Sequence, residues 1–168
     1  MPTQARAVIF ITGASSGLGR ACAERLHAHG YRVYGTSRDP ARAPGMPFPL
    51  LPVDVTDEQA VQQAVRTVVE REGRLDVAIN NAGFGVAGAI EDTRPDEAQR
   101  QLDVNLLGAL RVCRAVLPLM RGQGSGLILN VGSLGGRVGL PFQAFYSASK
   151  FALRGLTEAL RLEVQPYG

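Results

Sequence analysis

Residues 7–19 read AVIFITGASSGLG, an unbroken apolar run that passes directly into a glycine-rich turn. The run is partly β-branched, which is typical of a parallel strand covered on both faces. A helical pattern follows the turn as far as about His29, and Gly30 is placed to end that helix in a left-handed conformation. The stretch therefore predicts a buried strand, a tight turn and a helix in immediate succession.

The same alternation continues along the rest of the chain. We expect further strands at 32–37, 50–53, 75–79 and 127–131, a proline-rich loop at 40–49, and helices at 56–73, 95–120 and 144–164. Thr56 and Gln59 have the spacing of a capping box, and the helix from Pro95 is expected to break near Asn105. This order predicts a single α/β domain over residues 1–168, with a doubly wound parallel sheet of about five strands and helices on both faces.

Composition narrows the classes of function. The chain carries a net charge of +3, but its basic residues are scattered singly without interleaved aromatic residues, which argues against a nucleic-acid site. No apolar run approaches the ~18 residues of a membrane span, the two cysteines lack metal-ligand spacing, and residues 1–6 show no secretory signal. We therefore expect a cytoplasmic protein that binds neither nucleic acid, nor a membrane, nor a metal.

The glycine-rich turn has the features that a bound pyrophosphate needs. A helix N-terminus offers unpaired N–H groups and a favourable macrodipole, provided that the backbone can come close to the ligand. Gly13 would allow the tight turn, Gly17 the approach of a phosphate, and Gly19 close packing of helix on strand. The candidate nucleotide-binding residues of this turn are Gly13, Ser15, Ser16, Gly17, Leu18 and Gly19.

The end of the second strand bears on the choice of nucleotide. In a dinucleotide-binding fold, an acid at this point binds the ribose 2′-hydroxyl, whereas an arginine accommodates a 2′-phosphate. Ser37 stands where the acid is expected and Arg38 follows it, which favours NADP(H) over NAD(H). Asp39 could turn inward instead, so NAD(H) stays as the alternative.

Two further segments follow predicted strands and reach the same edge of the sheet. Asp54, after the third strand, could lie beside an adenine, or it could serve only as a polar helix-entry residue. Residues 80–83, with the sequence NNAG, follow the fourth strand at the edge where open α/β sheets bind ligands. The candidate cofactor contacts of these segments are Asp54, Val55, Asn81, Ala82 and Gly83.

Acid–base chemistry is suggested at the start of the last helix. Tyr146 and Lys150 are four residues apart, so they share one helix face. A free tyrosine has a pKa of about 10 and a neighbouring ammonium lowers that value, which suits general acid–base catalysis near neutrality. Lys150 is the only lysine among eighteen basic residues. This pair is therefore the strongest candidate for a catalytic centre.

Other residues could complete that centre. Ser133 follows the fifth strand, and its hydroxyl could donate to a substrate carbonyl oxygen beside Tyr146. Asn105 could hold a water molecule that continues a proton path from Lys150. Loop residues at this edge either line an apolar substrate pocket or pack the loops themselves; they are Phe84, Leu134, Leu140, Pro141 and Phe142.

Taken together, these motifs resemble those of the single-domain short-chain dehydrogenases/reductases. The matching residues cover the chain from residue 7 onward and are Thr12, Gly13, Gly17, Gly19, Asp54, Val55, 80–83, Asn105, Ser133, Tyr146 and Lys150. The resemblance implies that Asn105, Ser133, Tyr146 and Lys150 form a catalytic tetrad. It also implies that Tyr146 and Lys150 contact the cofactor, Lys150 at the nicotinamide ribose. It further implies a homo-oligomer, a dimer or tetramer, assembled through the helices at 106–121 and 144–164.

The chain departs from that family at its C-terminal end. Family members continue into two further strands, with a mobile substrate-binding loop between them, and these strands are absent here. We therefore expect a chain that is truncated or that is completed by oligomerisation, with residues 127–131 as an exposed edge strand.

The expected function is an NADP(H)-dependent interconversion of a secondary alcohol and a carbonyl compound by hydride transfer. The residues from Ala144 to Leu162 resemble those of reductases that act on steroids and retinoids, which implies an apolar small-molecule substrate. A nucleotide-binding or interaction protein that has lost turnover is the alternative. A relative of the sugar-nucleotide epimerases is a weaker one, because the substrate domain of that group is absent.

Overall fold

The computed structural model describes residues 7–167, so the segment 1–6, where no secretory signal is expected, lies outside the described residues. Five strands form one parallel sheet in the order β3-β2-β1-β4-β5. Their bounds are β1 Val8–Ile11, β2 Arg32–Ser37, β3 Leu50–Pro52, β4 Val77–Asn80 and β5 Leu127–Asn130. The predicted parallel sheet of about five strands is thereby confirmed.

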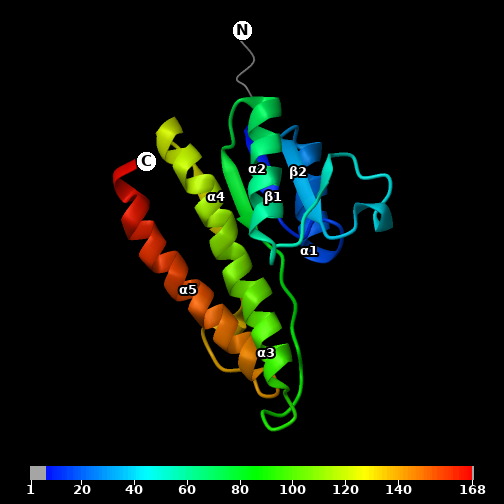
Figure 1. Ribbon diagram of the computed structural model, residues 1–168, viewed down its shortest axis with the longest axis vertical. Coiled ribbons are helices and arrows are strands. Elements are labelled where there is room, and N and C mark those ends of the chain that lie inside the picture. Colours follow the sequence, from blue (N-terminus) through cyan, green and yellow to red (C-terminus); the bar gives the residue numbers. More distant parts are fainter. Residues whose placement is uncertain (1–6, 168) are drawn as a thin grey trace.

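Helices follow the strands in the expected alternation (Figure 1). They are α1 Gly17–Ala28, α2 Glu58–Glu72, α3 Pro95–Leu102, α4 Gly108–Gln123 and α5 Ala144–Val164, with short 3-10 turns η1 Pro40–Arg42, η3 Leu134–Gly136 and η4 Gln165–Tyr167. The predicted break near Asn105 is a π-helical turn, η2 Asp103–Leu107, which joins α3 to α4. Among the residues that the structure describes, no helix is long and apolar enough to cross a membrane.

Two predicted elements begin at other residues than expected, and several predicted ends differ by one to three residues; for example, β3 ends at Pro52, β5 at Asn130 and α4 at Gln123. The capping box of Thr56 and Gln59 does not form. The N-cap of α2 is Asp57 instead of Thr56, because the Asp57 carboxylate accepts hydrogen bonds from the amides of Gln59 and Ala60. The fourth strand begins at Val77 rather than at residue 75.

Leu75 is fully buried, but its backbone is paired outside the sheet. The Gln123 side chain accepts from the Leu75 amide and donates to the Leu75 carbonyl, both at 3.0 Å. A side-chain amide at the end of α4 therefore takes the place of a strand neighbour.

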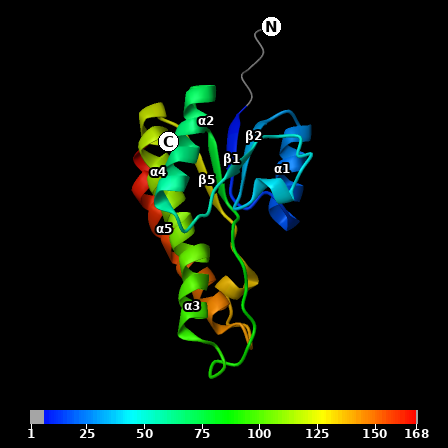
Figure 2. The same cartoon turned by 45° about the vertical axis from the view of Figure 1, so that its right-hand side comes forward.

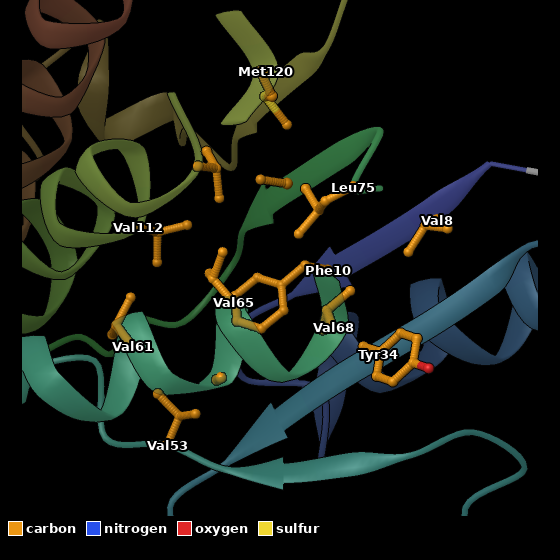
Figure 3. Packing of buried hydrophobic residues seen from close by; sticks show 13 residues of the cluster. Val8, Phe10, Tyr34, Val53, Val61, Val65, Val68, Leu75, Val112 and Met120 are labelled. Atoms are coloured by element: carbon orange, nitrogen blue, oxygen red, sulfur yellow. The ribbon is translucent and has the colours of Figure 1, made fainter. Parts of the chain in front are cut away.

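The hydrophobic core lies on both faces of the sheet. Helix α1 covers one face, and α2, α4 and α5 lie on the other (Figure 2). In the larger cluster, Phe10 of β1 meets apolar side chains of α2 and α4 (Figure 3), including Val61, Val65, Val68, Val112 and Val116. Full burial of one such side chain contributes about 1.5–3 kcal/mol. The apolar face of α2 is thus the face that holds this helix on the sheet.

Strand β5 forms the edge of the sheet, as predicted. Its side chains Leu127 and Leu129 are about half exposed, at 55% and 44%. On the opposite face, Asn130 donates a hydrogen bond of 2.8 Å to Thr157 of α5. A side-chain hydrogen bond therefore ties the edge strand to the last helix.

Candidate active site

A cleft of about 1890 Å³ runs along the carboxyl ends of the strands. Its lining includes each residue that the sequence proposed for the cofactor: Gly13, Ser15, Ser16, Gly17, Leu18, Gly19, Arg38, Asp54, Val55, Asn81, Ala82, Gly83, Tyr146 and Lys150. These residues lie in the segments that follow all five strands, and parallel strands bring such segments to one edge. The fold therefore gathers the candidates in one place.

The N-terminus of α1 faces this cleft without a side-chain cap. Ser16 is the N-cap residue, yet its hydroxyl caps no backbone amide, and the first turn of α1 contains no acidic residue. Gly17 has a φ of 54°, and the space beside its Cα is open. Free N–H groups and the positive end of the helix dipole thus point toward a space that an anion can enter.

The glycine turn is fixed from the neighbouring strand. The Asn81 side chain donates to the carbonyl oxygens of Thr12 and Gly13 at 2.9 and 3.2 Å. In return, the Thr12 hydroxyl oxygen accepts hydrogen bonds of 3.0 Å from the amides of Asn81 and Ala82. A Cβ at Gly19 would overlap the Gly13 carbonyl oxygen, which explains a glycine there. The Asn81 side chain is therefore used within the turn, and Thr12, which the sequence named as the first residue of the motif, has a structural role there.

At the end of β2, basic side chains border the cleft. Arg38 and Arg42 both line it, and neither guanidinium has a hydrogen bond or an ion pair within the described part of the chain. The Asp39 carboxylate accepts from the Ala41 amide at 3.1 Å, which caps η1. Arg42 was missed because the proline-rich loop gave no sign of the turn that returns it to the cleft.

Hydrogen bonds from Thr56, two residues further along the same loop, hold the Asp54 side chain in place. Its carboxylate accepts from the Thr56 amide at 2.9 Å and from the Thr56 hydroxyl at 2.8 Å. Burial disfavours the charged form, but these hydrogen bonds and two nearby positive charges outweigh it and lower the pKa of Asp54. The two charges belong to Arg38 and Arg100. The carboxylate thus stays ionised beside a positively charged part of the cleft.

Tyr146 and Lys150 lie on the first two turns of α5. The Tyr146 ring packs so closely that a Cβ on Gly135 would lie 3.3 Å from it. Lys150 is only 6% exposed, its Nζ donates to the Val131 carbonyl oxygen at 2.8 Å, and it lies 5.9 Å from the Tyr146 ring centroid. Burial lowers the pKa of Lys150. The ammonium is therefore held by a backbone carbonyl next to the tyrosine ring.

Ser133 begins the turn on which Tyr146 packs. Its Oγ accepts from the Gly135 amide at 3.1 Å and caps η3. Because a hydroxyl can accept and donate at once, its proton stays available to another acceptor. Ser133 thus lies two residues before Gly135, where an added Cβ would lie 3.3 Å from the tyrosine ring.

Asn105 is buried and its side-chain amide is fully used. Its Oδ1 accepts from the Phe84 amide at 3.0 Å, and its Nδ2 donates to the Phe84 carbonyl and to Ser149 Oγ at 2.9 and 3.1 Å. The side chain also borders a cavity of about 10 Å³ that Asn80 and Lys150 line as well. Such a space is about the size of one water molecule.

A polar chain that the sequence did not predict ties the strands to α5. Asn80 donates to Asn130 at 2.8 Å, and Asn130 donates to Thr157 at 2.8 Å. The Asn80 Oδ1 atom is buried and has no protein partner among the described residues. These side chains lie 27 and 50 residues apart in the sequence, so no local pattern reveals the chain.

The loops at the tyrosine end carry apolar side chains, but these enclose little space. Phe84 borders the cleft and is 36% exposed, whereas Leu134 and Phe142 are 66% and 70% exposed. Phe142 also has a φ of 60°, which is unusual for a residue with a side chain. Leu140 packs near Gly135. Of the five loop residues named from the sequence, only Phe84 lines the cleft.

Comparison with protein families and with curated proteins gives consistent results. The family model described as short chain dehydrogenase matches residues 7–168. The chain is 49% identical to a 3-ketodihydrosphingosine reductase of Bacteroides thetaiotaomicron, over 95% of this chain and 59% of that protein. It is 42% identical to human 17-beta-hydroxysteroid dehydrogenase type 1, over 98% of this chain and 54% of that one. The chain thus spans little more than half the length of these relatives.

Solved structures give the same picture. A short-chain dehydrogenase from Streptomyces avermitilis superposes with a TM-score of 0.91 at 39% identity, covering 99% of this chain and 63% of that one. A metagenomic short-chain oxidoreductase in complex with NADP superposes with a TM-score of 0.88 at 32% identity, covering 96% and 77% of the two chains. The sheet and helices described above therefore have close counterparts in solved proteins.

Proposed function

The chain belongs to the short-chain dehydrogenase family, and from this premise we propose that it interconverts a secondary alcohol and a carbonyl compound with NADP(H). One observation carries the proposal. Tyr146 and the buried Lys150 line the same cleft as the uncapped N-terminus of α1. An anion-binding end and an acid–base end in one cleft suit a reaction between a dinucleotide and a small carbonyl substrate.

The residues of the cleft fit a dinucleotide. The free N–H groups at the start of α1 would hold the pyrophosphate, and the open space beside Gly17 would let it approach. Asp54 would lie at the adenine, and Lys150 would reach the ribose next to the nicotinamide. A bound nicotinamide supplies the hydride for reduction and accepts it in the reverse direction.

The proton of the reaction would pass through Tyr146. In the direction of reduction, the Tyr146 hydroxyl donates its proton to the substrate carbonyl oxygen. The Ser133 hydroxyl donates a hydrogen bond to the same oxygen while its own Oγ accepts from Gly135. The Lys150 ammonium then favours the negative charge left on the tyrosine oxygen.

Asn105 would take part through the small cavity behind Lys150. Its side chain is already bonded to Phe84 and Ser149, so it would fix the wall of the cavity rather than touch the substrate. One water molecule in this cavity would accept a hydrogen bond from Lys150, which is the only cationic side chain among the described residues that line the cavity. This arrangement supports a proton path that leads from Tyr146 past Lys150 into the protein.

We further propose a preference for NADP(H) over NAD(H). Arg38 and Arg42 border the cleft with uncommitted guanidinium groups, while the Asp39 carboxylate caps η1. Two free positive charges suit a 2′-phosphate, and a committed carboxylate is less available to a 2′-hydroxyl. A similar structure is a complex with NADP, which supports the proposal without deciding the preference.

The substrate is proposed to be an apolar ketone. The relatives named above are a reductase of 3-ketodihydrosphingosine and a hydroxysteroid dehydrogenase, whose names describe largely hydrocarbon molecules. Phe84 at the cleft and the exposed Leu134 and Phe142 beside it offer apolar surface for such a molecule. We also propose a cytoplasmic homo-oligomer that packs through α4 and α5, where Leu110, Phe151 and Leu162 are exposed.

The second candidate is a nucleotide-binding protein of this fold without turnover. It is favoured by the open tyrosine end of the cleft, where the described loops leave Leu134 and Phe142 largely exposed. A substrate that is not enclosed by protein is not held in one geometry, and orientation accounts for much of enzymatic rate.

Turnover and cofactor binding separate the two candidates. Wild type and Tyr146→Phe would be compared for NADPH and NADH binding, and for NADPH oxidation with a long-chain ketone and a steroid ketone. Tyr31→Phe is the matched control, because Tyr31 lies on the surface away from the cleft. We expect turnover to fall about 10²- to 10⁴-fold in Tyr146→Phe, with cofactor binding retained. Cofactor binding with equal, minimal turnover in all three proteins would favour the second candidate.

A further inference from the structure

A single arginine of α4 connects two parts of the cleft that lie far apart in the sequence. Arg111 Nη1 donates to the carbonyl oxygens of Val55 and Asp103 at 3.3 and 3.4 Å. Its Nη2 donates to the Asp103 carboxylate at 2.8 Å. One guanidinium group thus contacts the loop after β3 and the start of the π-helical turn at the same time.

On the side of the loop after β3, the contact is both polar and steric. Val55 follows Asp54 at the adenine end of the cleft and is 7% exposed. A Cβ on Gly108 of α4 would lie 2.8 Å from a Val55 methyl carbon, so helix and loop already touch there. Arg111, one turn further along α4, adds hydrogen bonding to this packing. The loop and the first turn of α4 are therefore held together by both packing and a hydrogen bond.

On the other side, Arg111 holds the turn that carries Asn105. Asp103 is the first residue of η2, and Asn105 is its third. Through its side chain Asn105 is bonded to Phe84 and to Ser149, the residue before Lys150. A shift of η2 would thus be passed on to the tyrosine end of the cleft.

We propose that Arg111 is a positioning residue that couples the adenine end of the cleft to the catalytic end. A ligand that orders the Asp54–Val55 loop would, through Arg111, also order the π-helical turn and Asn105. The role of the coupling in turnover rests on the function proposed above, whereas the mechanical link between the two segments does not. The guanidinium group of Arg111 is planar and carries several N–H donors in fixed directions, so it can hold both segments at once.

The surroundings of Arg111 distinguish it from an ordinary surface ion pair. The side chains of Arg111 and Asp103 are 19% and 32% exposed. Arg114 lies three residues further along α4 and pairs with Glu58 at the same distance of 2.8 Å, but it is 62% exposed and contacts no part of η2. Exposed pairs of this kind contribute little to stability or geometry. Arg114 is thus a matched control on the same helix.

Amide hydrogen exchange reports on the link directly. The Phe84 amide donates to Asn105, and the Thr56 amide donates to Asp54, so each amide senses one end of the coupled unit. In the free protein we expect Arg111→Met to speed exchange at both amides about fivefold or more. Arg114→Met should leave both rates unchanged.

A ligand for the adenine end alone tests the coupling. Adenosine 2′,5′-bisphosphate carries no nicotinamide, so any effect on the Phe84 amide must pass through the protein. In wild type we expect saturating ligand to slow exchange of the Phe84 amide about fivefold, and in Arg111→Met we expect the ligand to bind without this effect. Arg111→Lys keeps a positive charge near Asp103 but has no planar fork, so it should restore stability without restoring the coupling.

Each outcome bears on one of the two proposals. Coupling that persists in Arg111→Met, that is fully restored by lysine, or that is lost equally in Arg114→Met would overturn the role of Arg111. Failure of wild type to bind the bisphosphate would contradict the proposed function, and the exchange rates of the free protein would still decide the mechanical link. Should Arg111→Met not fold, Asp103→Asn removes the ion pair while it leaves the backbone contacts, and it should speed exchange at Phe84 more than at Thr56.

Discussion

The two ends of the cleft are built in different ways. One end, which we call the nucleotide end, is formed by the glycine-rich turn and the loop of Asp54. There, hydrogen bonds join the backbone to side chains, as between Thr12 and Asn81. At the tyrosine end, the loops around residues 84 and 134–143 present apolar side chains to solvent, and Phe142 is held at a positive φ. Rigid geometry is thus concentrated where we propose that the dinucleotide binds, and exposed apolar surface where we propose that the substrate binds.

The same glycine-to-alanine change should be damaging at one end of the cleft and harmless at the other. At Gly19 an added methyl group would overlap the Gly13 carbonyl oxygen and the Asn81 side chain. We expect Gly19→Ala to lower the free energy of unfolding by about 1–3 kcal/mol and to weaken NADPH binding about a hundredfold, because α1 must move from the turn. Denaturant unfolding and calorimetric titration measure both effects.

Gly139→Ala is the control for this prediction. Gly139 lies in the loop at the tyrosine end, and nothing would contact its Cβ within 4 Å. Stability and NADPH affinity should remain within about 0.5 kcal/mol of wild type. If both alanine variants bound NADPH as wild type does, the nucleotide end would be no more rigid than the other.

Removing one arginine from each end of the cleft should affect the binding of NADPH at the nucleotide end only. Arg38 lines the nucleotide end, whereas Arg137 is exposed in the loop at the tyrosine end. We expect Arg38→Ala to weaken NADPH binding about tenfold or more and to leave NADH binding unchanged, since a charged hydrogen bond contributes about 1.5–3 kcal/mol. Arg137→Ala should change neither. Equal losses for both nucleotides would contradict the assignment of Arg38 to a 2′-phosphate.

The strain at Phe142 offers a test of the tyrosine end alone. A left-handed backbone costs a residue with a Cβ about 1 kcal/mol, and this side chain is 70% exposed, so it gains little from packing. Phe142→Gly should therefore be more stable than Phe142→Ala by about 1 kcal/mol, the reverse of the usual order for these residues. Thermal unfolding of the two variants measures the difference. An alanine variant that is the more stable of the two would show that the loop relaxes freely.

Much of the fold could be predicted from the sequence because its signals are local. The apolar runs gave the strands, and both β2 and α5 begin and end at the predicted residues. The cofactor candidates came together because parallel strands end at one edge, which topology alone requires. The exact start of α2 could not be predicted, since Thr56 and Asp57 are both good caps and only the bond from Thr56 to Asp54 decides between them.

The remaining parts of the site depend on contacts between distant residues. Asn81 looked like a ligand contact, yet its side chain is used by the turn of Thr12 and Gly13. The bond of Arg111 to Val55 spans 56 residues, and neither residue type suggests the other. Side-chain pairing across the sheet is set by packing in three dimensions, so these roles become visible only in the structure.

The smallest expected effect concerns the pH dependence of stability at the nucleotide end. The pKa of Asp54 is lowered in the fold, because the bonds from Thr56 and the charges of Arg38 and Arg100 outweigh the cost of burial. A carboxyl with a lowered pKa stabilises the fold above its unfolded pKa of about 3.9, and this stabilisation is lost as the pH falls through the lower, folded value. Asp54→Asn should therefore reduce the stability at pH 6 slightly and flatten its decline below pH ~4. Urea unfolding of wild type and Asp54→Asn between these pH values measures the difference, with Asp92→Asn as the control from the loop before α3. If the free energy of unfolding declined with equal slope in wild type and Asp54→Asn, the charge of Asp54 would contribute nothing to stability. The contrast between the two ends of the cleft would then rest on packing and backbone geometry alone.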